Sequence, residues 1–138
     1  MRQNRELNWI ICEQGDRWYR AVCRFAPDFV AVPSRLRVER IPREAAKQIV
    51  ARAKAAQGTS IVCWELPLVW TEYSSRLEGI ATIRCEATDV LQIAWLPATA
   101  ASELFLYAQE AGIGLFLNGP ESLQSAGEMV ARHLSPLG

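Results

Sequence analysis

The most constraining stretch of the chain is a short apolar run at residues 60–64, which ends in a carboxylate, Glu65, and then in Pro67. An uninterrupted apolar run of this length is typical of a strand that is covered on both faces in a parallel sheet. The last residue of such a strand emerges at the carboxyl edge of the sheet, where open α/β folds bind their ligands. Glu65 is therefore the first candidate functional residue.

The rest of the sequence alternates between strand-like and helix-like patterns with short links. Strands are predicted at 7–12, 36–41, 60–64, 90–95 and 113–117. Helices are predicted from Asp16 to about Phe25, from Pro42 to Gly58, from Thr71 to about Glu86, from Thr99 to Ala111, and beyond Pro120 along a stripe of Leu123, Ala126, Gly127, Val130, Ala131 and Leu134. Alternation with right-handed crossovers gives a parallel sheet between two helical layers. We expect an α/β fold, a three-layer α/β/α sandwich, formed by residues 1–138 as a single domain.

Charge and composition exclude several classes of protein. Fifteen basic residues balance fifteen acidic ones, so no net field attracts nucleic acid, and the arginines before residue 55 are interpreted as a solvated surface. No apolar segment has the length of a membrane helix, and the N-terminal apolar stretch is too short for a signal peptide. The four cysteines form no CxxC pair, and we expect them to be reduced and buried in a cytoplasmic protein. The chain ends at Gly138 with no output domain, so any effect on DNA is expected to pass through a partner.

Two passages resemble the receiver domain of two-component response regulators. The passage from Glu110 to Leu123 is similar to the family's last helix, strand and proline loop, and Cys63-Trp64-Glu65-Leu66-Pro67 is similar to the end of its third strand. The resemblance implies a flavodoxin-like, five-stranded parallel sheet in the order 2-1-3-4-5.

The resemblance fails at the residues that carry the family's chemistry. Glu65 stands where the family has its phosphoaccepting aspartate, and its extra methylene moves the carboxylate out of in-line geometry. Glu13 and Gln14 replace the acidic pair that holds Mg²⁺, bulky Trp95 or Leu96 replaces a small hydroxyl residue, and Asn118-Gly119 replaces the lysine. The family's fold is therefore expected without its phosphotransfer.

Several interpretations of the carboxyl edge remain open. Glu13 and Glu65 form either a residual cation site, or two solvated loop carboxylates, or a carboxylate fixed by backbone N–H groups. Glu65 could also imitate an acidified acceptor that holds one signalling state. Trp64, Trp70 and Trp95 either line a small-molecule pocket or fill the space that a missing active site leaves.

The helix ending at Ala111 offers a possible interface. Leu104, Tyr107, Ala108 and Ala111 make its inward stripe, but Phe105 and Tyr107 cannot both point inward. One side of the helix therefore exposes either an apolar patch for a partner or dimer, or merely scattered aromatics. His133, the one histidine, is assigned to complementing a helix dipole rather than to catalysis.

These observations favour a pseudo-receiver that signals or scaffolds through protein contacts without phosphorylation, and that is not an enzyme. The alternative is a small-molecule-binding module with a tryptophan-lined crevice. The ligand-binding candidates are Glu13, Gln14, Glu65, Trp95 and Asn118, and the interface candidates are Phe105 and Tyr107. No cofactor, metal, direct nucleic-acid contact or membrane contact is expected; the expected partner is a protein or a second copy of the chain.

Overall fold

The structure is a computed structural model that describes residues 6–26, 35–45, 47–55, 59–87, 89–97 and 99–134. The strands are β1 (Glu6–Glu13), β2 (Arg35–Pro42), β3 (Thr59–Glu65), β4 (Val90–Trp95) and β5 (Leu115–Leu117). The helices are α1 (Arg17–Phe25), the short 3₁₀ helix η2 (Arg43–Ala45), α2 (Lys47–Ala55), α3 (Trp70–Glu86), α4 (Ser102–Ala111), α5 (Ser122–Ser125) and α6 (Gly127–Leu134).

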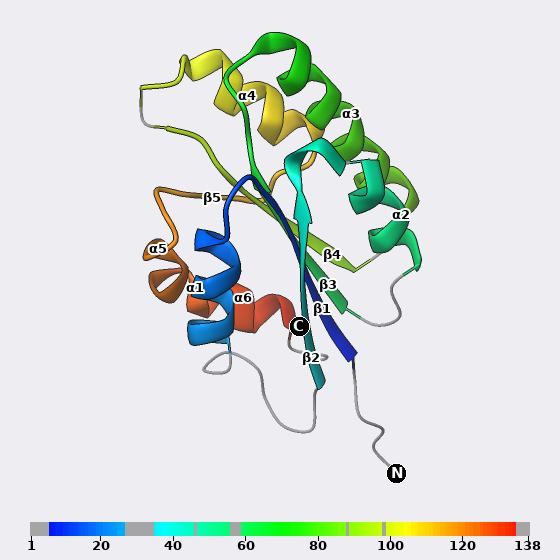
Figure 1. Cartoon of the computed structure of the whole chain (residues 1–138), viewed down its shortest axis with the longest axis vertical. Coiled ribbons are helices and arrows are strands. Elements are labelled where there is room, and N and C mark those ends of the chain that lie inside the picture. The colour runs from blue at the N-terminus through cyan, green and yellow to red at the C-terminus, as the bar shows by residue number, and fades with distance from the viewer. Residues whose placement is uncertain are drawn as a thin grey trace.

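The five strands form one parallel sheet in the order β2-β1-β3-β4-β5, as predicted. Helices α2, α3 and α4 cover one face, and α1, α5 and α6 cover the other (Figure 1). The fold is therefore the expected three-layer flavodoxin-like sandwich, in which β1 and β3 flank the point where the strand order reverses. None of the described helices has the length and apolar character needed to cross a membrane.

The central strand β3 divides its side chains between two cores. Val62 and Trp64 enter the core under α2, α3 and α4, whereas Ile61 and Cys63 enter the core under α1, α5 and α6. All its residues from Thr59 to Trp64 are buried. This double burial explains why the sequence of the strand is continuously apolar rather than alternating.

Trp64 also accounts for a glycine in the middle of α3. A Cβ on Gly79 would lie 3.3 Å from the Trp64 ring, so the absence of a side chain lets the ring pack closely against the helix. The indole Nε1 donates to Gln92 Oε1 at 2.9 Å, and Gln92 Nε2 donates to the Ile80 carbonyl oxygen at 3.0 Å. The buried amide of Gln92 is thereby satisfied at both ends.

Some element boundaries differ from the prediction. Thr99 does not cap α4: the amide of Ala100 donates to the Pro97 carbonyl in a turn, and the N-cap position falls on Ala101. The final helix is interrupted at Ala126, just before the poor helix former Gly127, and gives α5 and α6. Ala131, expected in the buried stripe, is exposed. The connection predicted at 28–33 lies outside the described residues.

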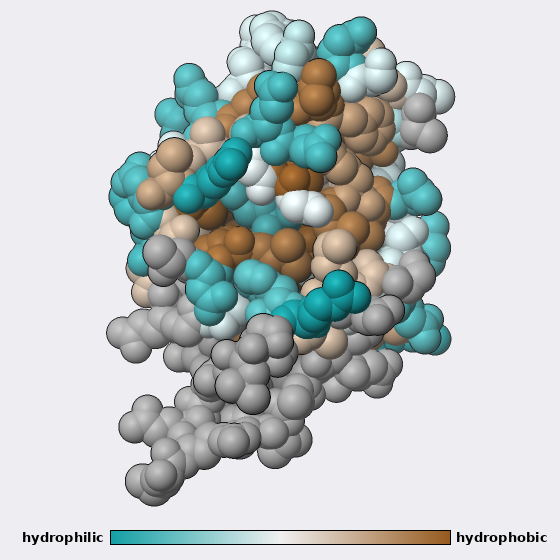
Figure 2. Space-filling model, turned by 180° about the vertical axis from the view of Figure 1, so that it is seen from behind, coloured by the Kyte–Doolittle hydropathy of each residue, from teal (hydrophilic) through white to brown (hydrophobic). Residues whose placement is uncertain are grey.

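The face turned away from the viewer in Figure 1 shows apolar side chains gathered around a hollow, with polar side chains on its rim (Figure 2). Several large apolar side chains are exposed on the molecule as a whole, namely Leu68, Val69, Trp70, Leu106, Tyr107 and Met129. The surface therefore contains apolar area that the fold itself does not cover.

The cysteines divide into two classes that thiol chemistry can distinguish. Cys12 and Cys63 are free and buried on adjacent strands, and burial raises their thiol pKa to about 11 and about 12. Cys23 and Cys85 are free but exposed, against the expectation that all four are buried.

We expect two thiols of the native chain to react quickly with a chromogenic disulfide at neutral pH and two to react only after unfolding, because the thiolate is the attacking species. Cys23→Ser and Cys85→Ser should each remove one fast equivalent. Fast labelling in a variant that lacks both would contradict the burial of Cys12 and Cys63.

Candidate functional site

The carboxyl ends of β1 and β3 place three of the predicted site residues together. Glu13 closes β1, Gln14 follows it, and Glu65 closes β3. Cys12 and Trp64 are register partners immediately before these ends. This edge is where the strand order reverses, and it is the location at which open α/β sheets present ligand-binding groups.

Glu13 is buried, and both of its carboxylate oxygens are engaged. Oε1 accepts from the Trp18 amide at 2.9 Å, and Oε2 accepts from the Tyr19 amide at 2.8 Å. Burial raises the pKa of the Glu13 carboxyl, the two backbone hydrogen bonds oppose this rise, and the nearby charge of Glu65 adds to it. Of the three interpretations of the carboxylates, the one that fits Glu13 is a carboxylate fixed by backbone N–H groups.

Glu65 is half-exposed and contacts the same loop. Its Oε1 accepts from the Gln14 amide at 3.1 Å, which ties the end of β3 to the turn after β1. Within the described ranges, no group of three or more His, Cys, Asp or Glu residues could hold a metal ion. The two carboxylates therefore lie near each other but bind backbone amides of the protein.

Arginines that the sequence analysis did not single out surround this loop. Arg40 on β2 donates to the carbonyl oxygens of Gly15, of Gln14 at 2.7 Å and of Glu13 at 3.3 Å. The sequence could have indicated Arg40 by its position, because the carboxyl ends of two paired parallel strands lie side by side, and Arg40 is near the end of β2. Arg40 thus saturates the carbonyl groups of the β1–α1 turn.

A polar cavity of about 250 Å³ adjoins the turn, lined by Gln14, Arg43, Glu72 and Arg76. Arg43 donates to Gln14 Oε1 at 3.1 Å and pairs with Glu72 at 3.0 Å, and Arg76 donates to the Arg43 carbonyl at 2.9 Å. Most of the polar groups around this cavity are consequently paired with one another.

The structure separates the three tryptophans that were expected to share a crevice. Trp64 is buried in the core under α3, Trp95 packs on the opposite face of the sheet, and Trp70 is exposed. Trp95 Nε1 donates to the Asn118 carbonyl oxygen at 2.7 Å, so these two predicted residues do lie together at the β4–β5 end. Side chains alternate between the two faces along each strand, so residues at the same edge of the sheet can point to opposite faces.

Exposed apolar residues gather instead on the surface formed by the β3–α3 loop and α4. We call this surface the aromatic patch; it comprises Leu68 (52% exposed), Val69 (60%), Trp70 (56%), Leu106 (52%) and Tyr107 (42%). The Trp70 ring lies 5.9 Å from that of Tyr73 and 6.1 Å from that of Tyr107, measured between centroids. The patch is therefore continuous between the two elements.

The two predicted interface residues behave differently. Tyr107 belongs to the patch, not to the inward stripe in which it was also expected. Phe105 is half-buried and packs edge-on against Phe116, with ring centroids 5.3 Å apart. Residues two apart on a helix point in different directions, and here Phe105 packs against the core while Tyr107 faces outward.

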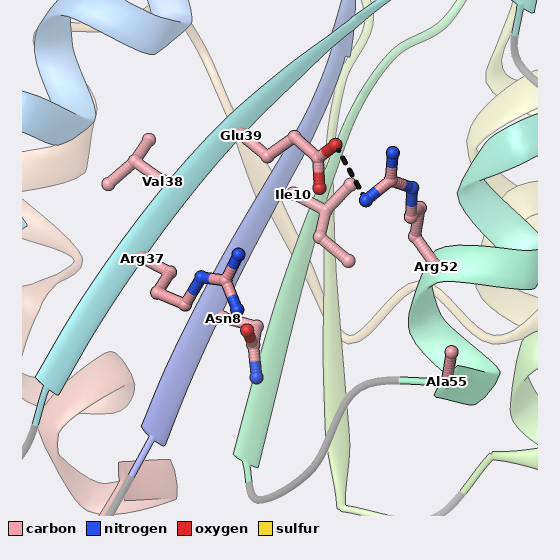
Figure 3. A pocket seen from close by; sticks show the side chains of 7 residues that line it. All are labelled: Asn8, Ile10, Arg37, Val38, Glu39, Arg52 and Ala55. Atoms are coloured by element: carbon pink, nitrogen blue, oxygen red, sulfur yellow. Dashed lines mark ion pairs between the residues drawn. The ribbon is translucent and has the colours of Figure 1, made fainter.

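A groove of about 400 Å³ lies on the sheet face shared with α2. We call it the β1–β2 groove; it is lined by Asn8, Ile10, Arg37, Val38, Glu39, Arg52 and Ala55 (Figure 3). Glu39 and Arg52 form an ion pair across it at 3.1 Å, and Arg37 points toward Asn8 (Figure 3). Sequence reasoning missed this groove because its residues come from three elements.

No protein-family model matches the sequence, and a comparison with curated proteins gives no match. A crystal structure from Burkholderia thailandensis, named as a candidate pilus assembly protein, CpaE, is similar in fold with a TM-score of 0.61. The superposition covers 91% of this chain and 98% of that chain, with 22% sequence identity. The likeness supports the flavodoxin-like, receiver-like fold.

Removing the Glu13 carboxylate tests its structural role. Glu13→Ala leaves two amides at the start of α1 without their acceptor, so we expect the free energy of unfolding to fall by about 1–2 kcal/mol in chemical denaturation. Glu65→Ala, which removes one half-exposed contact, should cost less than about 0.5 kcal/mol. Equal losses in the two variants would show that Glu13 does not hold α1.

The pH dependence follows from the raised pKa of Glu13. A raised folded-state pKa means that the folded chain binds the proton more tightly, so this contribution to stability is present at low pH and is lost as pH rises through the folded pKa. The stability gap between wild type and Glu13→Ala should therefore widen as pH falls from neutral toward the ordinary value of 4.5. If the difference in stability between wild type and Glu13→Ala narrows as pH falls, the pKa of Glu13 is lowered by folding rather than raised.

Proposed function

We propose that this chain is a receiver-like domain that acts through protein contacts and neither accepts nor transfers a phosphoryl group. The observation that carries the proposal is the state of Glu13, whose two oxygens accept from the Trp18 and Tyr19 amides. Each of these oxygens already accepts one amide, and Gln14 stands where a second acid would add charge, so this edge offers a cation fewer and weaker ligands than an acidic pair does. A weaker cation site supplies less of the charge that phosphoryl transfer depends on.

The acceptor position adds a second obstacle. Glu65 has an extra methylene and is bound to the Gln14 amide at 3.1 Å, and Arg40 fixes the carbonyl groups of the same turn. Positioning and preorganised charge supply most of the catalysis in phosphoryl transfer, so these changes act on one transition state. An enzymatic role is accordingly not part of the proposal.

The aromatic patch supplies the contact surface that the proposal needs. Aromatic residues are enriched at protein interfaces, and Trp and Tyr are the commonest residues to dominate binding energy. Trp70 is 56% exposed and stacks on Tyr73, so its ring is held in place while one side remains accessible. The structural neighbour is named for pilus assembly, and a role within a protein assembly is consistent with a surface of this kind. Four free thiols support a reducing compartment such as the cytoplasm.

The alternative, a small-molecule-binding module, has one supporting observation at the carboxyl edge of the sheet. The polar cavity beside Gln14 has a volume of about 250 Å³, slightly below the range of typical ligand pockets, about 300–1,000 Å³. Its arginine Arg43 is already paired with Glu72 and Gln14. This function ranks second because a ligand would have to displace those internal contacts.

The proposal predicts no phosphorylation by a small donor. After incubation with acetyl phosphate and Mg²⁺, intact mass spectrometry should show no added phosphoryl mass, because the acceptor geometry and the metal ligands are both altered. A phosphoryl adduct that disappears in Glu65→Ala would overturn the proposal. An adduct that persists in that variant would also contradict the proposal and would place the modification at a residue other than Glu65.

The contact surface can be tested by site-specific photo-crosslinking in the cells that naturally produce the chain. A photoreactive side chain at Tyr107 should give discrete protein adducts, and one at exposed Gln124 on α5 should not. A second substitution, Trp70→Ser, should reduce the Tyr107 adducts, whereas Met129→Ser, which removes an exposed apolar side chain outside the patch, should leave them unchanged. Equal yields of adducts at the two positions would contradict a contact role for the patch. So would a yield at Tyr107 that Trp70→Ser leaves unchanged.

A further inference from the structure

The neutral net charge conceals an uneven distribution along the chain. Residues 1–58 contain twelve Lys and Arg against six Asp and Glu, a net charge of +6, whereas residues 59–138 contain three against nine, a net charge of −6. A separation of this size produces opposite potentials on different parts of one surface.

The strand order converts these halves of the sequence into halves of the molecule. β2 and β1 lie at one side of the sheet, where α1 and α2 contact them, and β3, β4 and β5 follow toward the other side. The basic half therefore contains the free edge of β2, and the acidic half contains the free edge of β5. Two ion pairs, Arg43 with Glu72 and Lys54 with Glu86, join the halves where they meet.

The aromatic patch lies in the acidic half. Its α4 residues are flanked by exposed Glu103 and Glu110, and α4 contains no basic residue. Glu72 follows Trp70 closely in the first turn of α3. An apolar surface with an acidic rim selects a partner surface that has a basic rim and space for its side chains.

The β1–β2 groove lies in the basic half, and its lining is mainly polar. Ala55 contributes exposed apolar surface, Ile10 is almost fully buried, and the two arginines, Arg37 and Arg52, lie on either side of the groove (Figure 3). One acid, Glu39, is paired with Arg52, so the charged side chains of the lining sum to +1. Its volume of about 400 Å³ gives space for aromatic side chains from another chain.

We propose that a second copy of this chain is the partner: the aromatic patch of one copy seats in the β1–β2 groove of another. This inference rests on the proposed function as a contact domain and specifies its partner. Burial of Trp70 and its neighbours supplies the affinity, and the charges of the two rims set the orientation. Because patch and groove are different surfaces, each copy offers one of each.

Sedimentation velocity of the full chain tests the proposal. The sedimentation coefficient should rise with protein concentration at low salt, and the association should weaken at about 1 M NaCl, where the Debye length is about 3 Å. Trp70→Ser on the patch and Arg52→Glu in the groove should each weaken association by roughly tenfold or more. Met129→Ser and Arg17→Glu, the same changes at exposed positions outside both surfaces, should leave association within about threefold of wild type.

A mixing experiment separates this pairing from other modes. Equimolar Trp70→Ser and Arg52→Glu restores one intact patch and one intact groove, so the mixture should associate more strongly than either variant alone. Circular dichroism should show that each variant retains the wild-type helical signal. Failure of the mixture to associate more strongly, with both variants folded, would overturn patch-into-groove pairing.

Two other results would also overturn the inference. One is a chain that stays monomeric at every concentration; if the Tyr107 crosslinks to another protein persist, the proposed contact function stands and only the identity of the partner is wrong. The other is binding of duplex DNA that Arg52→Glu abolishes in a chain that shows no self-association. That result would assign the basic half to a polyanion.

Discussion

The buried carboxylate of Glu13 holds the β1–α1 turn in one arrangement at the carboxyl edge of the sheet. An ionised carboxylate away from water is costly unless it is hydrogen-bonded, and here the amides of Trp18 and Tyr19 compensate it. Asp16 occupies the N-cap position of α1 but makes no capping bond with its side chain, and the first turn contains no acid. Glu13 therefore supplies both the acceptors and the negative charge that the start of α1 favours. Arg40 then fixes the carbonyl groups of the intervening turn, so donors and acceptors are satisfied together.

This arrangement shows which parts of the fold a sequence can predict. The strands and the double burial of β3 were predicted from periodicity, and the strand order was predicted from the resemblance of two passages to the receiver family. The sequence also placed Glu13, Gln14 and Glu65 at one edge. It could not show that the Glu13 carboxylate accepts hydrogen bonds from the amides five and six residues later. It also could not show that the Arg40 side chain reaches the β1–α1 turn. Both contacts depend on side-chain direction and on distances in the folded chain.

The tryptophans illustrate the same limit in the core. Trp64 was a candidate for a ligand crevice because it precedes Glu65, yet an adjacent residue in a strand points to the opposite face. Gln92 and Gly79 then determine its surroundings: the amide accepts its indole N–H, and the glycine leaves space for its ring. A buried polar residue and a mid-helix glycine are each unfavourable alone, and together they form a packed and hydrogen-bonded site. Both were visible in the sequence, but their partnership was not.

The charge distribution has a different physical status from these contacts. The ion pair of Lys54 with Glu86, which joins the two halves, is solvent-exposed, and exposed pairs contribute little to stability, about 0–1 kcal/mol. The boundary pair of Arg43 with Glu72 neutralises one acid of the rim of the aromatic patch, but Glu103 and Glu110 of that rim and the arginines of the groove remain. Folding alone does not require twelve basic residues in one half of the chain and nine acidic residues in the other. A polarised surface acts on what approaches it, so its consequence is the orientation of a partner rather than the stability of the fold.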